Sequence, residues 1–178
     1  IELSQNYPNS EVFPSSMNQI GNFSLSQHLT ILKMKLAPDG KTMFILARYS
    51  REVMISFEIW NITDLRNAHR TSSINISDIQ LSRTYFSSNY QTAYLAFSKK
   101  MVVLDISNKT SPSVIGTYPL TINNEFLRFD DFAVTSDGKT GFAVLNSSRI
   151  TGFHFSDSSS DLLRFWSVNR MSHATAGA

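Results

Sequence analysis

The fold class of this chain follows from the segment MVVLDISNKTSPSVIGTY, residues 101–118. The segment predicts an apolar strand over Met101–Ile106, a turn that contains Asn108 and Pro112, and a second strand over Val114–Tyr118. Weaker copies of its neighbourhood recur at intervals of about fifty residues, which is typical of a repeat architecture.

Three hairpin signals recur with nearly constant spacing. Asp and Gly together favour a tight hairpin turn because Gly adopts a positive φ at little cost. The turns contain Asp39-Gly40, Asn89-Tyr90 and Asp137-Gly138, and the residues that follow them are 50 and 48 residues apart, at Lys41, Gln91 and Lys139. Large apolar residues at equivalent positions predict the core of each first strand at Leu36, Phe86 and Val134. Trp60 and Leu104, at matching positions of two later strands, are expected to be buried between repeats.

Each copy continues with a third and a fourth predicted strand. The third strands are expected over Met54–Ile62, Met101–Ile106 and Ile150–Phe155, and the fourth over Thr71–Ile76, Val114–Tyr118 and Leu162–Val168. Four antiparallel strands per copy are typical of a propeller blade. The sequence therefore predicts an all-β partial propeller of about three four-stranded blades, with a β-sandwich as the alternative fold.

Three regions follow from this pattern. Residues 1–19 are expected to form an irregular arm. Residues 20–168 are expected to hold the three blades and an extra entry strand at Ile20–Leu25, which resembles Ile115–Leu120. Residues 169–178, rich in Ser, Ala and Gly, are expected to be a flexible tail. Because the chain begins at Ile1, we expect it to be processed or to be part of a longer protein.

Composition excludes several classes of function. The net charge is +2 and the longest basic run is Lys99-Lys100, so we expect no nucleic-acid partner. The chain has no Cys, which removes disulfides and thiolate metal sites. Apolar runs are too short to span a membrane, so no membrane-spanning segment is expected.

No catalytic or metal-binding motif is found. His28, His69, His154 and His173 lack ligand spacing, and Asp130-Asp131 lacks the further oxygen ligands of a calcium loop. We therefore assign no catalytic residue, metal or cofactor. Alignment of the repeats places Lys33, Arg83 and Asp131 at one position, just before each first strand. These charges are candidates for a binding site at the mouth of a central channel, or are ordinary solvated charges at strand ends.

The segment at 101–118 resembles the LVIVD-repeat family, in which an apolar strand ends in Asp-Ile-Ser-Asn and a later strand ends in Gly-x-aromatic. The matching residues are Val102–Asn108, Ser111-Pro112 and Val114–Tyr118. The first copy departs by placing Asn61 at the position of Asp105, and the third copy places His154 there. We expect the Asp105 side chain to accept hydrogen bonds from turn amides. The resemblance implies surface or secreted propellers, mostly without an assigned activity.

Five Asn-x-Ser/Thr triplets are candidates for N-linked glycans. Asn108 and Asn146 fall in predicted polar turns and are the preferred sites, whereas Asn61 follows Trp60 inside a predicted strand. The five residues are Asn108, Asn146, Asn75, Asn22 and Asn61.

Three blades are too few to close a propeller, which typically needs about four to eight. We therefore expect a protein partner or self-assembly through the open blade edges. The sequence favours a non-enzymatic, extracellular or cell-surface segment acting in adhesion, scaffolding or assembly. Two alternatives remain: a segment of a hydrolase or lyase whose catalytic residues lie on other blades, and a glycan-binding module.

Overall fold

The computed structural model describes residues 29–49, 54–78, 80–122, 125–126, 129–145, 149–155 and 164–167. Every regular element within these residues is a β-strand, and the strands form three four-stranded antiparallel sheets and one two-stranded hairpin. The prediction of an all-β chain with three four-stranded copies is therefore confirmed.

The three sheets follow one another along the chain, and we call them blades 1, 2 and 3. Blade 1 contains β1 (Leu29–Leu36), β2 (Thr42–Tyr49), β3 (Ile55–Asn61) and β4 (His69–Ile76). Blade 2 contains β5 (Leu81–Phe86), β6 (Thr92–Phe97), β7 (Lys100–Asp105) and β8 (Ser113–Pro119). Blade 3 contains β11 (Phe129–Val134), β12 (Thr140–Leu145), β13 (Arg149–His154) and β14 (Arg164–Ser167).

The third and fourth strands of all three blades lie within about two residues of the ends predicted from the sequence. The hairpin of β9 (Thr121–Ile122) and β10 (Glu125–Phe126), between blades 2 and 3 in the sequence, was not predicted. The expected arm at 1–19, the entry strand at Ile20–Leu25 and the tail at 169–178 lie outside the described residues.

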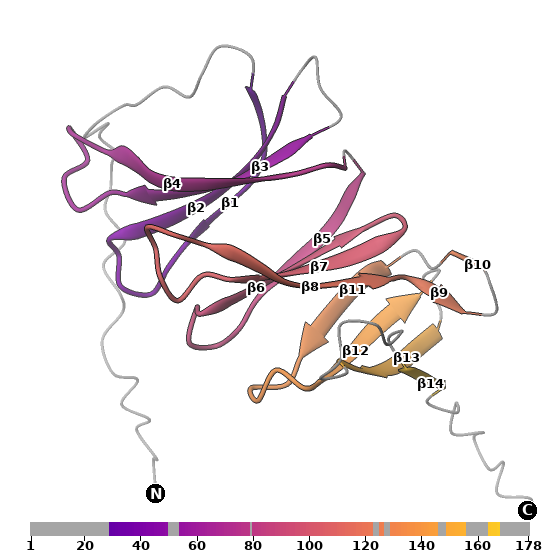
Figure 1. The fold of residues 1–178 in the computed structure, drawn as a ribbon. Coiled ribbons are helices and arrows are strands. Elements are labelled where there is room, and N and C mark those ends of the chain that lie inside the picture. Colours follow the sequence, from indigo (N-terminus) through magenta and orange to yellow (C-terminus); the bar gives the residue numbers. More distant parts are fainter. Residues whose placement is uncertain are drawn as a thin grey trace, which may run out of the picture.

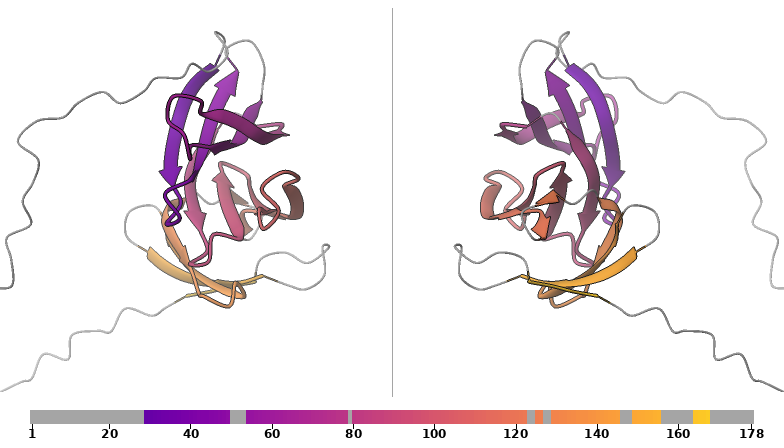
Figure 2. Two further views of the ribbon diagram at one scale, coloured as in Figure 1. Left: turned by 90° about the vertical axis from the view of Figure 1, so that its left-hand side faces the viewer. Right: turned by 90° about the vertical axis from the view of Figure 1, so that its right-hand side faces the viewer.

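The blades are stacked in chain order, with blade 2 between the other two (Figures 1 and 2). Within each blade the strands pair in sequence order, so the first strand of each blade is an edge strand. The first strands of neighbouring blades are joined by hydrogen bonds, from Lys33 Nζ to the Thr84 carbonyl at 3.4 Å and from Ser82 Oγ to the Phe129 carbonyl at 2.6 Å. This arrangement is that of an open propeller whose first strands line the axis.

The first hairpin turn has the same geometry in all three blades. The left-handed residue of each turn is Gly40 at φ 64°, Tyr90 at φ 54° and Gly138 at φ 73°. The residue before it accepts a hydrogen bond with its side-chain oxygen from a backbone N–H two residues further on. Asp39 accepts the Lys41 N–H at 2.8 Å, and Asp137 accepts the Lys139 N–H at 3.0 Å. The turn alignment made from sequence is thus confirmed, including its weaker copy at Asn89-Tyr90.

Two apolar clusters hold the blades together. Alternating residues of each strand point to opposite faces, so blade 2 packs on blade 1 with one face and on blade 3 with the other. The cluster between blades 1 and 2 includes Phe44, Phe57, Leu95 and Leu104. The cluster between blades 2 and 3 includes Tyr94, Met101, Phe132, Leu145 and Phe153. Burial of Leu104 between blades is therefore confirmed.

Two core predictions were wrong because the chain shows no described blade in front of blade 1. Leu36 is paired with Met43 on the face of blade 1 that points away from blade 2, and its side chain is 53% exposed. At the equivalent position Val134 is buried against blade 2. Trp60 is also buried, but in a separate cluster with Ile45 and Ile62 rather than between two described blades.

Candidate functional site

The three predicted channel residues occupy strictly equivalent positions, but not where they were expected. Lys33, Arg83 and Asp131 lie inside β1, β5 and β11, each directly after a break in the pairing register with the next strand. The prediction that they precede the strands was wrong because the strands begin before these bulges. All three side chains are exposed.

Each of these charged side chains is engaged with the backbone rather than with one another. Lys33 donates to the Thr84 carbonyl of blade 2, Arg83 Nη1 donates to the Ser82 carbonyl at 2.9 Å, and Asp131 accepts the Phe132 N–H at 2.9 Å. Positions 33 and 83 thus carry donors, whereas position 131 carries an acceptor. Lys33 bonds to the next blade, whereas Arg83 and Asp131 bond to residues of their own strands.

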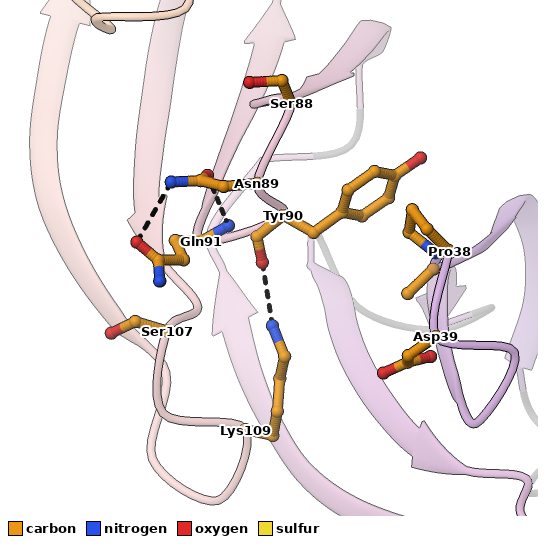
Figure 3. A pocket seen from close by; sticks show the side chains of 9 residues that line it. Pro38, Asp39, Ser88, Asn89, Tyr90, Gln91, Ser107 and Lys109 are labelled. Atoms are coloured by element: carbon orange, nitrogen blue, oxygen red, sulfur yellow. Dashed lines mark hydrogen bonds between the residues drawn. The ribbon is translucent and has the colours of Figure 1, made fainter.

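A pocket of about 370 Å³ opens between the turns of blades 1 and 2 (Figure 3). Its lining comes from the Pro38-Asp39 turn of blade 1, the Ser88–Gln91 turn of blade 2, and Ser107 and Lys109 of the turn between β7 and β8. Sequence reasoning missed this pocket because its lining combines turn residues that are far apart in the chain.

Lys109 lines the pocket and contacts both blades. Its Nζ donates to the carbonyls of Tyr90 at 2.8 Å and Ile106 at 2.7 Å, and lies 5.1 Å from the centre of the Phe44 ring of blade 1. Burial lowers the pKa of the Lys109 ammonium, and the carboxylates of Asp39 and Asp105 act in the opposite direction. The ammonium therefore hydrogen-bonds within blade 2 and contacts blade 1 through the Phe44 ring.

Tyr90 holds the left-handed position that Gly occupies in the other two turns. Such a backbone conformation is costly for a residue with a large side chain, on the order of 1 kcal/mol or more. Its ring stacks on Phe86 and Phe44 at centroid distances of 5.6 and 6.2 Å, which offsets part of this cost. The polar and aromatic groups of the pocket thus serve the joint between blades, and we assign them no catalytic role.

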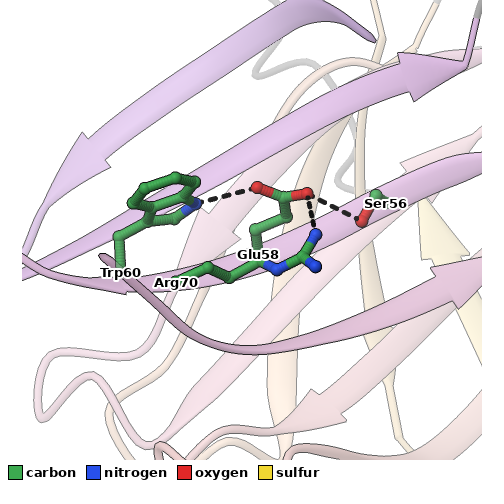
Figure 4. Close-up of polar contacts among 4 residues, drawn as sticks. All are labelled: Ser56, Glu58, Trp60 and Arg70. Atoms are coloured by element: carbon green, nitrogen blue, oxygen red, sulfur yellow. Dashed lines mark hydrogen bonds and ion pairs between the residues drawn. The ribbon is translucent and has the colours of Figure 1, made fainter. Parts of the chain in front are cut away.

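A buried polar network lies on the outward face of blade 1 (Figure 4). The Glu58 carboxylate is fully buried and accepts hydrogen bonds from Trp60 Nε1 at 2.8 Å, Arg70 Nη1 at 3.0 Å and Ser56 Oγ at 3.4 Å. By strand register the equivalent of Glu58 is Val102 in blade 2 and Thr151 in blade 3. The charge is therefore a property of this one face, and it fixes the Trp60 indole.

The sequence carries no signal that this carboxylate is buried. Ser56 and Glu58 alternate with Ile55, Phe57 and Ile59, a pattern typical of a strand with one solvated face.

Among the described residues, no three His, Cys, Asp or Glu side chains converge as metal ligands. Within the same residues, no helix is long and apolar enough to span a bilayer. His69 and His154, both described, contact the Asn67 carbonyl and the Thr140 hydroxyl, whereas His28 and His173 lie outside the described residues.

Comparison with family models gives one match, to the LVIVD repeat, over residues 82–119. The matched range covers the four strands of blade 2. Blade 2 matches the LVIVD repeat. No curated protein matches the chain.

Solved structures share the fold at low sequence identity. The β-propeller domain of Cps50 (Swd1) from Myceliophteria thermophila aligns with a TM-score of 0.58 and 8% identity, over 80% of this chain and 45% of that chain. A hypothetical selenium-binding protein from Sulfolobus tokodaii gives 0.56 and 12%, over 82% and 43%. A putative 6-phosphogluconolactonase from Bacteroides fragilis gives 0.56 and 11%, over 80% and 39%. The chain spans less than half the length of each structure, and the likeness shows the propeller fold alone.

The LVIVD motif of blade 2 has a clear physical basis in the structure. The Asp105 carboxylate accepts the Ser107 N–H at 2.9 Å, and Asn61 accepts the Thr63 N–H at 2.9 Å in blade 1. In the Gly-x-aromatic element the Tyr118 ring lies directly over Gly116, where a Cβ would come within 2.6 Å of the ring. Gly116 is thus needed for the close approach of Tyr118.

The motif carboxylate predicts a specific response to acid. Side-chain and backbone hydrogen bonds with Ser107 lower the pKa of Asp105 below its ordinary value of 3.8. Its contribution to stability is therefore present above that value and is lost as the pH falls through the lower folded-state pKa. We expect Asp105→Asn to remove this loss, on the order of 0.5 kcal/mol because the carboxyl is exposed. Urea unfolding at about pH 6 and about pH 3 measures the difference.

The matched control is the reverse change, Asn61→Asp, which should add the same acid sensitivity to blade 1. An identical acid response in the wild type and both variants would contradict the assigned role of this position.

The network of Figure 4 predicts a larger effect. Arg70→Met leaves the Glu58 charge buried without its ionic partner, and we expect a loss of on the order of 3 kcal/mol in the free energy of unfolding. Combining it with Glu58→Gln should recover most of the loss because no buried charge remains. The control, Arg83→Met, removes an exposed arginine and should change stability by less than about 0.5 kcal/mol in urea unfolding. A loss for Arg70→Met as small as that of the control would rule out the network as a stabilising element.

Proposed function

We propose that this chain is a non-enzymatic β-propeller segment of a secreted or cell-surface protein, which acts by binding other polypeptides in adhesion, scaffolding or extracellular assembly. One observation carries the proposal: both ends of the blade stack present apolar side chains that the internal interfaces of the same stack bury.

The outward face of blade 1 carries exposed side chains along β1. Ile31, Met34 and Leu36 are among the large apolar residues that remain exposed in the described part of the chain. Contiguous exposed apolar side chains on one sheet face are typical of an interaction surface. We call these three residues the front patch.

The outward face of blade 3 has the same character. Phe142 and Ile150 are exposed there and border a hollow of about 230 Å³, with Asp131 at its edge. We call Phe142 and Ile150 the rear patch. In contrast, the polar groups of the pocket between blades 1 and 2 are engaged in holding the fold, which favours binding at the ends over chemistry in the middle.

An experiment with a photoreactive amino acid tests the proposal. Benzoylphenylalanine placed at Leu36 or at Ile150, in the source organism, should form covalent adducts with a polypeptide that peptide sequencing identifies. The same residue at Val114, which is exposed at 47% on the outer strand of blade 2, is the matched control and should form none. Equal adducts from all three positions, or none from the two end positions, would contradict the proposal.

The extracellular location is supported by the LVIVD resemblance and by the exposure of three sequon residues, Asn61, Asn75 and Asn108. Asn108 uses its side-chain oxygen to accept the N–H and the hydroxyl of Thr110, at 3.1 and 2.8 Å, which leaves the side-chain nitrogen outside these bonds. Asn22 and Asn146 lie outside the described residues.

We therefore expect Asn108 to carry an N-linked glycan when the chain passes through a eukaryotic secretory pathway, since it lies in an exposed turn, whereas Asn61 and Asn75 lie in β3 and β4. Glycopeptide mass spectrometry should find Asn108 occupied more fully than Asn61, and Thr110→Ala should abolish its occupancy. Full occupancy of Asn61 with a bare Asn108 would reverse the ranking.

A further inference from the structure

A pocket of about 260 Å³ opens between blades 2 and 3. Its aromatic lining is Tyr94 and Tyr118 of blade 2 and Phe155 of blade 3, and the Asp137–Lys139 turn of blade 3 supplies its charged groups. The Phe155 ring lies 5.3 Å from the Tyr94 ring and 5.4 Å from the Tyr118 ring, between centroids. A pocket lined by aromatic side chains with a few polar groups is typical of a ligand site.

The Tyr94 hydroxyl is a polar group of this pocket that lacks a hydrogen-bond partner in the described part of the chain. Tyr94 is 3% exposed, and its hydroxyl lies 3.1 Å from the point where a Cβ on Gly138 would stand. Burial and the nearby Tyr85, Tyr118 and Asp137 raise the pKa of this phenol, so it stays protonated at neutral pH. A polar group in so buried a side chain normally has a partner, and here the partner must come from the pocket.

The joint between blades 1 and 2 holds an ammonium of the chain itself at the equivalent place. By strand register Phe44 there corresponds to Tyr94 here. By turn position Tyr90 there corresponds to Gly138 here. The Lys109 ammonium lies 5.1 Å from the centre of the Phe44 ring and donates to two carbonyls of blade 2, of which one is that of Tyr90. An ammonium beside an aromatic ring and on carbonyl oxygens is a stabilising arrangement.

The joint between blades 2 and 3 keeps the equivalent acceptors but not the lysine. The two carbonyls that bind Lys109 correspond to those of Gly138 and Phe155, which line the pocket and accept no hydrogen bond from a described residue. Lys109 is the fourth residue after the end of β7, and the fourth residue after the end of β13 is Ser158, which lies outside the described residues. The sequence therefore supplies no ammonium at this position of blade 3.

Asp137 gives the pocket a negative charge. Its Oδ1 accepts hydrogen bonds from the Thr135 hydroxyl and from the Lys139 N–H, which hold the pKa of the carboxyl below its ordinary value of 3.8. The group is therefore ionised at neutral pH, and its Oδ2 lies outside these two bonds. The exposed Lys139 ammonium is close enough to interact with the same carboxylate, and a bound cation has to compete with it.

We propose that this pocket binds an alkylammonium group, the chemistry that Lys109 supplies between blades 1 and 2. The ammonium lies against the Tyr94 ring and donates to the Gly138 carbonyl and the Asp137 carboxylate, while its alkyl chain packs on the other two rings. A lysine side chain of another polypeptide and a free amine present the same group. The site is separate from the two ends of the blade stack.

The test is a titration of the purified chain with n-butylammonium, followed by the amide NMR signals of Gly138 and Lys139. We expect saturable binding with a Kd of about 1 mM, because so small a ligand makes few contacts. The same chain length without a positive charge, as n-butanol or butyrate, should bind at least about tenfold more weakly. Equal binding of all three probes would overturn the proposal.

Two substitutions that preserve the local structure test the contacts. Asp137→Asn should weaken binding about tenfold, and its turn should persist because Asn89 accepts the equivalent N–H at 3.1 Å in blade 2. The matched control is Asp39→Asn in the first turn of blade 1, which should bind the probe as the wild type does. Tyr94→Phe removes only the hydroxyl, since Phe44 is its equivalent, and should weaken binding about fivefold.

Lys139→Gln decides the sign of the ligand's charge. It removes the competing cation, so the probe should bind this variant at least as tightly as the wild type. Weaker binding to Lys139→Gln together with tighter binding to Asp137→Asn would identify an anion site and overturn the proposal.

Lysine blocked at its backbone, as Nα-acetyl-lysine methylamide, separates the two sources of the group. Binding at least as tight as that of n-butylammonium supports a lysine of another polypeptide, and binding at least about tenfold weaker supports a free amine. Absence of saturable binding by both probes, or wild-type affinity in Asp137→Asn, overturns the site. Neither result bears on the proposed function, because cross-linking tests that function at the ends of the stack.

Discussion

The whole structure depends on one constraint: each blade has two apolar faces and needs a neighbour on both. A four-stranded sheet with a solvated side would show apolar residues on one face only, yet β6 of blade 2 is buried at five consecutive positions, Ala93 to Phe97. Such a strand is stable only between two layers. Blade 2 has both layers, and blades 1 and 3 each have one within the described part of the chain. The exposed apolar side chains at the two ends of the stack follow from the number of neighbouring layers.

The second organising element is the chemistry of the turns. Three first turns repeat one geometry, in which a short polar side chain accepts backbone N–H groups and a left-handed residue completes the bend. The conserved geometry tolerates different residues, since Asn89 replaces Asp and Tyr90 replaces Gly. The turns fix the strand-pairing register of each blade, and this register decides which side chains point into the interface between blades.

The fold was predictable from the sequence because its signals are local. A hairpin turn with Asp-Gly and alternating apolar residues is visible within about ten residues, and its recurrence fixes the number of blades. The exposure of Leu36 was not predictable in this way, because it depends on whether a blade precedes the first one. Burial of Glu58 was missed for a related reason: alternation along β3 specifies a face but not what lies against it.

The same distinction applies to the candidate sites. The equivalence of Lys33, Arg83 and Asp131 was correctly read from spacing, since it depends only on the repeat. Their position inside the strands depends on bulges, which leave no clear mark in the sequence. The role of Lys109 was missed because its three contacts come from two blades, and one of them is an aromatic ring some sixty-five residues earlier in the chain.

Tyr90 has a consequence for the order in which the chain folds. Its turn adopts a backbone conformation that a tyrosine resists, and the ring of Phe44 from the preceding blade helps to stabilise it. The hairpin of β5 and β6 therefore forms most favourably on a blade 1 that is already in place. Lys109 strengthens the dependence, because its ammonium spans the same joint. We therefore expect blades 1 and 2 to fold as one cooperative unit rather than as independent repeats, in the direction in which a ribosome delivers the chain.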